Sequence, residues 1–248
     1  MKRRAAFPLF LGVPLLTLFN ETKGTETLSF QSSEDRVQLL ELFTSQGCSS
    51  CPPAERWINQ FIDHPGLWSE IVPVVYHVNH WDRLGWKDPF VSKQFTQRQY
   101  DYAENGRFRQ VYTPCFVSNG NEWRGCFSKE SLSNEKGKAG VLQATIEKGR
   151  MTVSYSEEKP LTLNVAILGL DLETDVKRGE NRGRKLNQQF VALDHQTSTS
   201  SSGKWAIKMP SIDPDQAHRF AIAIWVTKRG KSEPLQATGS WIDSHHFN

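Results

Sequence analysis

The sequence predicts an α/β domain with a mixed central sheet flanked by helices, followed by a small all-β sandwich-like domain. In the first half, almost continuous apolar runs at 37–43 and 71–78 are typical of strands buried on both faces. After residue 150, apolar and polar residues alternate with a period of two, which indicates half-buried antiparallel strands. The chain of 248 residues has room for two domains, which we place at 30–149 and 150–248.

The N-terminus resembles a secretory signal. Lys2, Arg3 and Arg4 precede an apolar run over 5–19, which is short for a membrane span. We therefore interpret 1–24 as a signal peptide, in preference to a retained anchor or a buried helix. Export predicts a periplasmic or extracellular protein with no stable membrane span after signal removal, in a compartment where disulfides persist.

The net charge of +3 is too small to indicate a nucleic-acid partner. The more informative feature is a pair of cysteines, Cys48 and Cys51, just after the first buried strand. The apolar positions that follow have helical spacing and are Ala54, Trp57, Ile58 and Phe61. A thiol at the start of a helix is stabilised as a thiolate by the helix dipole and by unpaired N–H groups. The pattern favours a redox-active CxxC, with a structural disulfide and a metal site as alternatives.

The rest of the first half alternates helices and strands. After the strand at 71–78, we expect an aromatic and polar loop, a helix with Ser92 as its N-cap, and a strand at 111–117. Asn119-Gly120 is a strong hairpin signal, and we expect a helix over about 128–148 to follow.

Thr113-Pro114 comes just before an apolar strand in a chain that already has a CxxC near its start. Thioredoxin-like folds carry a cis-proline loop facing the dithiol at this place, so we predict a cis bond here. A cis bond would leave the backbone of Thr113 free to pair with an extended peptide substrate. The alternative is an ordinary proline on an edge strand.

In the second half, alternating runs around Met151, Leu163 and Ile224 predict the strands. Between two of them lies a basic loop made up of Lys177, Arg178, Arg182, Arg184 and Lys185. We interpret it as a solvated hairpin in preference to a site for an anionic partner, with Glu180 and Asn181 ordering the loop internally.

Five stretches together resemble a known family. They are residues 41–54 (ELFTSQGCSSCPPA), 77–82 (HVNHWD), 84–90 (LGWKDPF), 112–114 (YTP) and 178–184 (RGENRGR). The chain resembles the bacterial secreted thioredoxin-like family catalogued as domain of unknown function 1223. The resemblance covers nearly all of the exported part. It implies a thioredoxin-like domain followed by a β-rich one, and it implies no established reaction.

One position departs from the family pattern. The residue after the Thr-Pro pair is usually polar in the family, whereas here it is Cys115, with Cys126 eleven residues on. In a two-residue hairpin Cys115 opposes Arg124, so a disulfide to Cys126 needs a bulge at Gly125. We expect a hairpin disulfide between Cys115 and Cys126, and the alternative is that Cys115 acts as a third redox thiol.

The loop after the second strand holds further candidate residues. Its polar and aromatic side chains should lie on the same side of the sheet as the CxxC, and we take Trp81 and Asp82 as substrate-binding. His77, His80 and Asp82 also suit thiol tuning or, with the cysteines, a Zn or Cu site. No spacing matches a standard zinc motif, so we predict no metal, and the simpler alternative is a packed loop.

These observations predict a thiol–disulfide oxidoreductase without a cofactor, acting on a protein or small-molecule thiol or disulfide. Cys48 is the expected attacking thiolate and Cys51 the resolving thiol, since Cys48 is nearer the helix end. Two alternatives stay open. One is a redox-inert thioredoxin scaffold that binds an envelope partner, and the other is a metal carrier that uses the CxxC.

Overall fold

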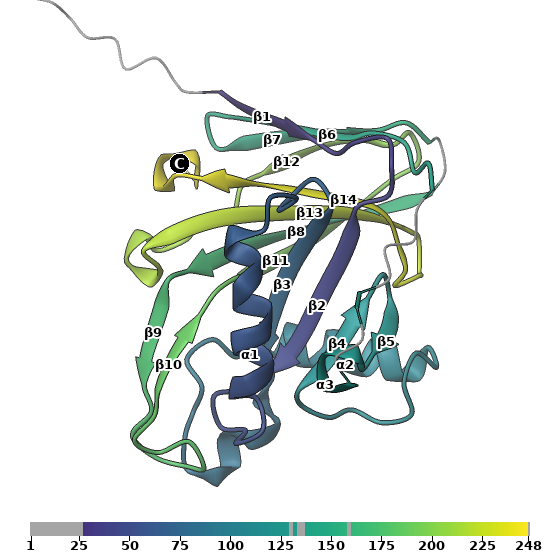
Figure 1. Cartoon of the computed structure of the whole chain (residues 1–248). Helices are drawn as coiled ribbons and strands as arrows, with labels where there is room; N and C mark the ends of the chain where they lie inside the picture. Colours follow the sequence, from purple (N-terminus) through teal and green to yellow (C-terminus); the bar gives the residue numbers. More distant parts are fainter. Residues whose placement is uncertain (1–26, 129–130, 133–136, 158–159, 248) are drawn as a thin grey trace, which may run out of the picture.

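The fold has a mixed central sheet with few helices and a separate small antiparallel sheet (Figure 1). The computed structural model describes residues 27–128, 131–132, 137–157 and 160–247, so the expected signal peptide lies outside the described residues. The central sheet has eight strands in the order β14-β13-β8-β11-β3-β2-β4-β5. The small sheet has the order β1-β6-β7-β12, and β9 pairs with β10 in a hairpin.

The elements follow one another closely along the chain. The strands are β1 (Leu28–Gln31), β2 (Gln38–Thr44), β3 (Ile71–His77), β4 (Cys115–Ser118), β5 (Asn121–Trp123), β6 (Leu142–Glu147), β7 (Arg150–Tyr155), β8 (Leu161–Leu170), β9 (Leu172–Asp175), β10 (Lys185–Gln188), β11 (Val191–Ser200), β12 (Lys204–Lys208), β13 (Arg219–Lys228) and β14 (Pro234–Ile242). The α-helices are α1 (Pro52–Asn59), α2 (Lys93–Glu104) and α3 (Gly125–Ser128), and the 3₁₀ helices are η1 (Gln60–Asp63), η2 (Asn79–Leu84), η3 (Pro214–Gln216) and η4 (Ser244–Phe247). In the described part of the chain, no helix is both long and apolar enough to cross a membrane.

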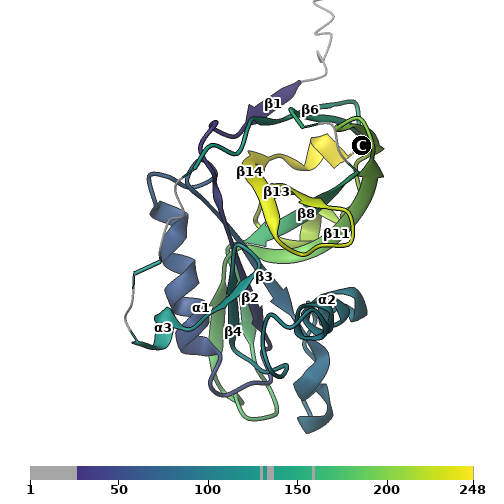
Figure 2. The ribbon, with the colours of Figure 1, turned by 90° about the vertical axis from the view of Figure 1, so that its right-hand side faces the viewer.

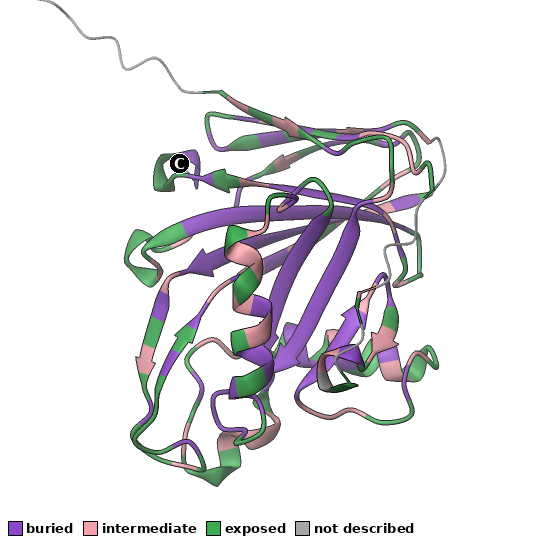
Figure 3. Cartoon of the chain, in the orientation of Figure 1, coloured by how far each residue is buried: buried purple, intermediate pink, exposed green. Residues whose placement is uncertain are grey.

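The two central strands β2 and β3 run parallel, and every residue of both is buried. Their apolar runs suit this position because helices α1 and α2 cover opposite faces of the pair (Figure 2). Figure 3 shows both strands buried along their whole length. The N-terminus of α2 is capped as expected, since the Ser92 hydroxyl accepts a hydrogen bond from Gln94 N at 3.2 Å.

The central sheet continues past β3 through a short parallel contact with β11. Val191 lies opposite Val75, and Val75 N donates to Phe190 O at 2.8 Å. Strands β8, β13 and β14 extend the sheet from there by antiparallel pairing. Strands from before and after residue 150 therefore share both the central sheet and the small sheet.

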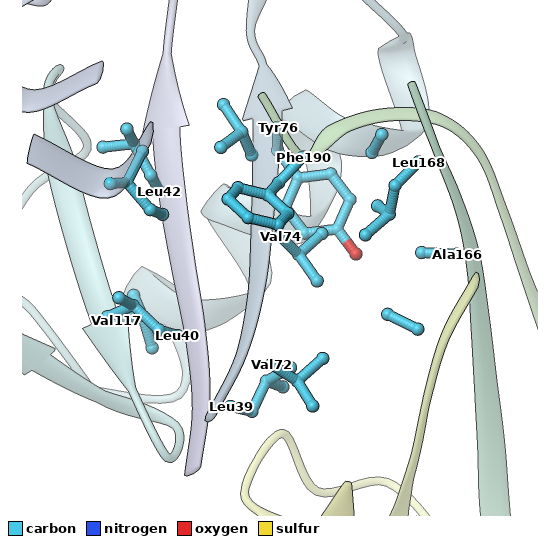
Figure 4. Packing of buried hydrophobic residues seen from close by; sticks show 14 of the residues in the cluster. Leu39, Leu40, Leu42, Val72, Val74, Tyr76, Val117, Ala166, Leu168 and Phe190 are labelled. Atoms are coloured by element: carbon cyan, nitrogen blue, oxygen red, sulfur yellow. The ribbon is translucent and has the colours of Figure 1, made fainter. Parts of the chain in front are cut away.

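Strand β8 separates two hydrophobic cores. Ala166 and Leu168 face the first core with β2, β3 and both long helices (Figure 4). Val165 and Ile167 face the second core, which lies between the central sheet and the small sheet. Both faces are apolar because the strand is covered on both sides, as its burial pattern shows.

The helix expected over about 128–148 is wrong for the described residues of that range. Leu142–Glu147 forms strand β6, in which buried and more exposed residues alternate. The strand turns into β7 at Lys148-Gly149, where both residues have positive φ, as in a two-residue hairpin. Asn119-Gly120 has the same conformation and forms the hairpin that the sequence predicts between β4 and β5.

A buried ion pair ties β2 to α2. Arg98 Nε donates to Glu41 Oε1 at 2.6 Å, and the Tyr102 hydroxyl donates to the other carboxylate oxygen. The guanidinium also lies over the ring of Trp225 in β13, 5.2 Å from its centroid. The Arg98 side chain therefore contacts both β2 and β13, which lie in different parts of the central sheet.

We predict that Arg98→Met strongly destabilises the protein, because it leaves the fully buried Glu41 carboxylate without a cation. Removal of one partner from a buried pair costs about 3–5 kcal/mol. Urea denaturation of the variant, compared with the exposed-pair control Arg124→Met, measures this. Equal unfolding midpoints for the two variants would contradict the prediction.

Candidate functional site

The turn after β2 positions the CxxC. Ser45 O accepts from Cys48 N at 3.0 Å, and the Ser45 hydroxyl accepts from Gly47 N at 3.1 Å. Gly47 lies against the side chain of Trp81, where an added Cβ would be 2.9 Å from the tryptophan Cβ. A larger residue does not fit there without movement of Trp81, so the glycine allows the η2 segment to pack against the turn.

Cys48 and Cys51 form a disulfide with a Cα–Cα distance of 5.4 Å. Cys51 is the N-cap residue of α1, so the disulfide lies at the positive end of the helix. Pro52 and Pro53 occupy the first two helical positions, where a backbone N–H is not needed. Both cysteines are buried, with Cys48 1% and Cys51 0% exposed.

The predicted cis bond at Thr113-Pro114 is confirmed, and the loop that contains it faces the disulfide. The Thr113 carbonyl oxygen lies 3.8 Å from Cys48 Sγ. Trp81 Nε1 donates to the Thr113 hydroxyl at 2.7 Å. Three stretches distant in the sequence therefore meet at this point: the CxxC turn with the start of α1, η2 and the cis-proline loop.

Of the four residues expected to bind substrate, Thr113, Pro114 and Trp81 lie at this point, and Asp82 follows Trp81 in the chain. Asp82 Oδ1 is 3.5 Å from Asp88 N, and burial raises the pKa of Asp82. His80 is further away and pairs through Nε2 with Gln99 Oε1 at 2.8 Å. The structure brings together Cys48, Cys51, Thr113, Pro114 and Trp81.

Three buried ionisable residues lie along the inner side of the site. Thr44 donates to Glu55 Oε1 at 2.7 Å, and Glu55 is one helical turn after Cys51. His77, at the end of β3, contacts Asp88 through Nδ1 at 2.7 Å. Asp88 also accepts from the backbone N–H of Gln46 at 2.8 Å, so the buried charges are joined to the CxxC turn.

The pKa values in this group are shifted in different directions. Burial raises the pKa of Glu55, with the positive charge of His77 opposing the shift. Burial alone would lower the pKa of His77, but the Asp88 carboxylate raises it above its ordinary value. Burial alone would raise the pKa of Asp88, but His77 lowers it. The Asp88 carboxylate therefore favours the protonated form of His77, and burial favours the protonated form of Glu55.

The loop between β9 and β10 covers the CxxC turn from outside. Asn181 Nδ2 donates to the backbone oxygens of Gln46 and Cys48, at 2.8 and 2.9 Å. Glu180 Oε2 accepts from Ser49 N at 3.1 Å, and hydrogen bonds from the side chain and then the backbone of Ser49 lower the pKa of Glu180. Glu180 and Asn181 were expected to order their own loop, and these side chains instead hold the loop against the disulfide.

Comparison with known proteins places the chain in a family. The sequence profile of DUF1223, described as a protein of unknown function, matches residues 39–227. The chain belongs to the DUF1223 family. The match contains the CxxC, the buried charges, the cis-proline loop and the covering loop.

Two solved structures resemble this DUF1223 protein. The X-ray structure of protein AGR_C_4864 from Agrobacterium tumefaciens has 24% identity and a TM-score of 0.62, over 83% of this chain and 94% of the other. HBP35 of Porphyromonas gingivalis has 14% identity and a TM-score of 0.53, over 86% of this chain and 77% of the other. At these identities the likeness concerns the fold alone. No curated protein matches the chain at a significant level.

The expected disulfide between Cys115 and Cys126 is not present, and both residues are free thiols. Cys115 opposes Arg124 in the register that the sequence predicts, but the chain enters α3 at Gly125, so Cys126 is on a helix and not on the paired strand. Burial raises the pKa of Cys115 to about 12, so its thiol stays protonated at neutral pH. A protonated thiol is a poor nucleophile, which disfavours Cys115 as a third redox thiol.

The histidines near the CxxC are not grouped with it as metal ligands. Within the described residues, a group of metal-ligating side chains is found at the C-terminus and consists of Asp243, His245 and His246, with ligand atoms within 4.8 Å of one another. Tetrahedral Zn²⁺ with bonds of about 2.1 Å holds its ligands about 3.4 Å apart.

Sequence reasoning missed Glu55, Asp88, Gln46 and Asn181 as site residues. Glu55 carried a signal, because it follows Cys51 by four residues and so lies on the same face of the helix. Asn181 and Gln46 carried none, since Asn181 contacts residues more than a hundred positions away and Gln46 contacts residues 42 and 142 positions away.

The pair His77–Asp88 predicts a pH-dependent stability. The lowered pKa of Asp88 contributes stability above its ordinary value of 3.8, and the raised pKa of His77 contributes stability below its ordinary value of 6.5. Asp88→Asn should therefore lose most stability, relative to the wild type, between these two values. The loss should shrink as the pH rises through the raised pKa of His77.

Urea denaturation from pH 4 to 9 checks this, with the exposed Asp175→Asn as control. A difference between wild type and Asp88→Asn that stays constant over this range would contradict the assignment of opposite charges to the pair.

Proposed function

We propose that this protein is an exported thiol–disulfide oxidoreductase in which the Cys48–Cys51 disulfide accepts electrons from a protein or small-molecule thiol. The observation that carries the proposal is the disulfide at the start of α1, with the Thr113 carbonyl 3.8 Å from Cys48 Sγ. The helix end stabilises the thiolate that reduction produces. The cis-proline loop offers backbone groups to a substrate.

The order of elements supports a thioredoxin-like identity for this part of the fold. A strand leads into the CxxC and α1, β3 and α2 follow, and the cis-proline precedes the hairpin of β4 and β5. Export to the periplasm or the exterior rests on the basic and apolar residues of 1–24. In such a compartment the disulfide is the resting form, and the substrate supplies the thiols.

The reaction that we propose has two exchange steps. A substrate thiolate attacks Cys48 Sγ, the bond between Cys48 and Cys51 breaks, and Cys51 leaves as a thiolate that takes up a proton. A second substrate thiol, as its thiolate, then attacks the substrate sulfur of the mixed disulfide, and Cys48 leaves as a thiolate. The substrate dithiol is oxidised to a disulfide, and the protein gains two electrons.

Glu55 is the residue that we assign to the proton transfer at Cys51. Its carboxyl group lies one turn along α1 on the same face, and burial raises its pKa, which favours a proton there. A protonated acid beside the leaving sulfur lowers the barrier to its departure. The neighbouring pair His77–Asp88 supplies a fixed charge environment that solvent does not screen.

A redox-inert scaffold is the second candidate, because both sulfur atoms are buried. A bond between residues three apart closes a very small loop, so it constrains the unfolded chain little. A purely structural role would therefore contribute little stability. The small loop closed by Cys48 and Cys51 therefore favours exchange chemistry over a structural role.

The test is a redox titration of the purified protein. Wild type and Cys48→Ser are equilibrated in graded glutathione buffers, and free thiols are alkylated and counted by mass spectrometry. We expect the wild type to gain two alkylated thiols, at Cys48 and Cys51, within the range of exchange proteins, above about −300 mV. A pair that stays oxidised below about −300 mV would contradict the proposal and would indicate a structural disulfide.

A further inference from the structure

The loop between β9 and β10 (residues 176–184) is held against the CxxC turn, beside the disulfide. Its contacts join it to the CxxC turn by three side-chain hydrogen bonds, two from Asn181 and one to Glu180. Cys48 is 1% exposed beneath it, whereas Ser49 and Ser50 are exposed. Thiol–disulfide exchange needs direct access to the attacked sulfur. The closed arrangement excludes a bulky thiol from that sulfur.

The contacts between this loop and the CxxC turn can break at low cost in free energy. Asn181 is fully buried, yet its Oδ1 has no hydrogen-bond partner among the described residues. A buried carbonyl without a partner is unfavourable, and opening of the loop would hydrate it. Gly179 and Gly183 border the pair Glu180-Asn181, and both have positive φ, a conformation that other residues rarely adopt. The loop therefore has, on both sides of its contacts with the CxxC turn, backbone positions that glycine adopts without strain.

Glu180 also puts a negative charge at the end of the CxxC that stabilises a Cys48 thiolate. Its carboxylate accepts a hydrogen bond from the backbone N–H of Ser49, the residue directly after Cys48. In the oxidised protein both sulfur atoms are in the disulfide, so no thiolate charge lies near this carboxylate. After reduction, a Cys48 thiolate lies one residue before Ser49, which holds the Glu180 carboxylate, and like charges so placed repel.

We propose that Glu180 and Asn181 form a redox-sensitive latch, in which Glu180 acts as a positioning residue for Cys48. The latch closes over the disulfide and is released when Cys48 becomes a thiolate. This rests on the proposed function, and it adds two properties to it. Glu180 disfavours the thiolate and so makes the disulfide harder to reduce, and the loop favours small thiols over bulky ones in the closed state.

The experiment compares wild type, Glu180→Gln and Glu180→Ala, with Glu173→Gln as the matched control. Glu173 carries the same charge on the same hairpin but pairs with Lys185, away from the CxxC. Each protein is reduced by dithiothreitol and, separately, by a thiol-terminated polyethylene glycol of about 5 kDa. The equilibrium with dithiothreitol and the pKa of the Cys48 thiol are measured alongside the rates.

We expect Glu180→Ala to react about tenfold faster with the polymer thiol than the wild type does. A tenfold change corresponds to about 1.4 kcal/mol, by which the substitution would make the closed state of the loop less stable. Both Glu180 variants should lower the pKa of the Cys48 thiol and ease reduction, while Glu173→Gln behaves as wild type. Hydrogen exchange at residues 176–184 should be faster in the reduced wild type than in the oxidised one.

Glu180 variants that match the wild type and Glu173→Gln in rate, equilibrium and Cys48 pKa would overturn the latch. Equal exchange of the loop in both redox states would also overturn it. These outcomes are distinct from failure of the proposed function, because dithiothreitol reduces even a disulfide that is too stable for glutathione. A wild type that resists glutathione, with variants that still differ from it, would refute the function and keep the latch.

Discussion

The short parallel contact between β3 and β11 determines where the β9–β10 hairpin lies. Val75 N donates to Phe190 O, and this joins β8 and β11 to the edge of the strand that ends at His77. The hairpin lies between β8 and β11 in the chain, so it projects past the same end of the sheet as the CxxC. In Figure 1 it runs down beside α1 towards the turn before that helix. Together with the hydrogen bond from Asn59 in α1 to Asn187 O in β10, this junction brings Asn181 to the CxxC turn.

The site is thus built from two kinds of contact with opposite physical character. On the inner side, His77 and Asp88 are fully desolvated and joined by hydrogen bonds to the turn, so they fix the charge around the disulfide. On the outer side, Glu180 is exposed to solvent and its attraction for Ser49 N is screened. The inner contacts are strong and permanent, and the outer ones are weak enough to break. This difference suits the exchange chemistry that we propose for the buried disulfide.

Local patterns in the sequence predict much of this fold and less of the site. The strands β2 and β3, the Ser92 cap, the Asn119-Gly120 turn and the cis bond at Thr113-Pro114 all follow from signals within a few residues. The pairing of β3 with β11 and the placement of Asn181 depend on contacts between residues more than a hundred positions apart, for which one sequence holds no local signal. The helix expected over 128–148 failed because pairing of β6 with β7 outweighed local helix propensity, as tertiary contacts commonly do.

The most direct test of the central claim is to trap the covalent intermediate at Cys48. In Cys51→Ala, the thiolate of Cys48 should attack an added disulfide peptide and keep half of it as a stable mixed disulfide, because no resolving thiol remains. Peptide mapping by mass spectrometry should find the adduct at Cys48 in Cys51→Ala and no adduct at Cys51 in Cys48→Ala. An absence of adduct at Cys48, under conditions where the free Cys126 is modified, would contradict a redox role for this pair.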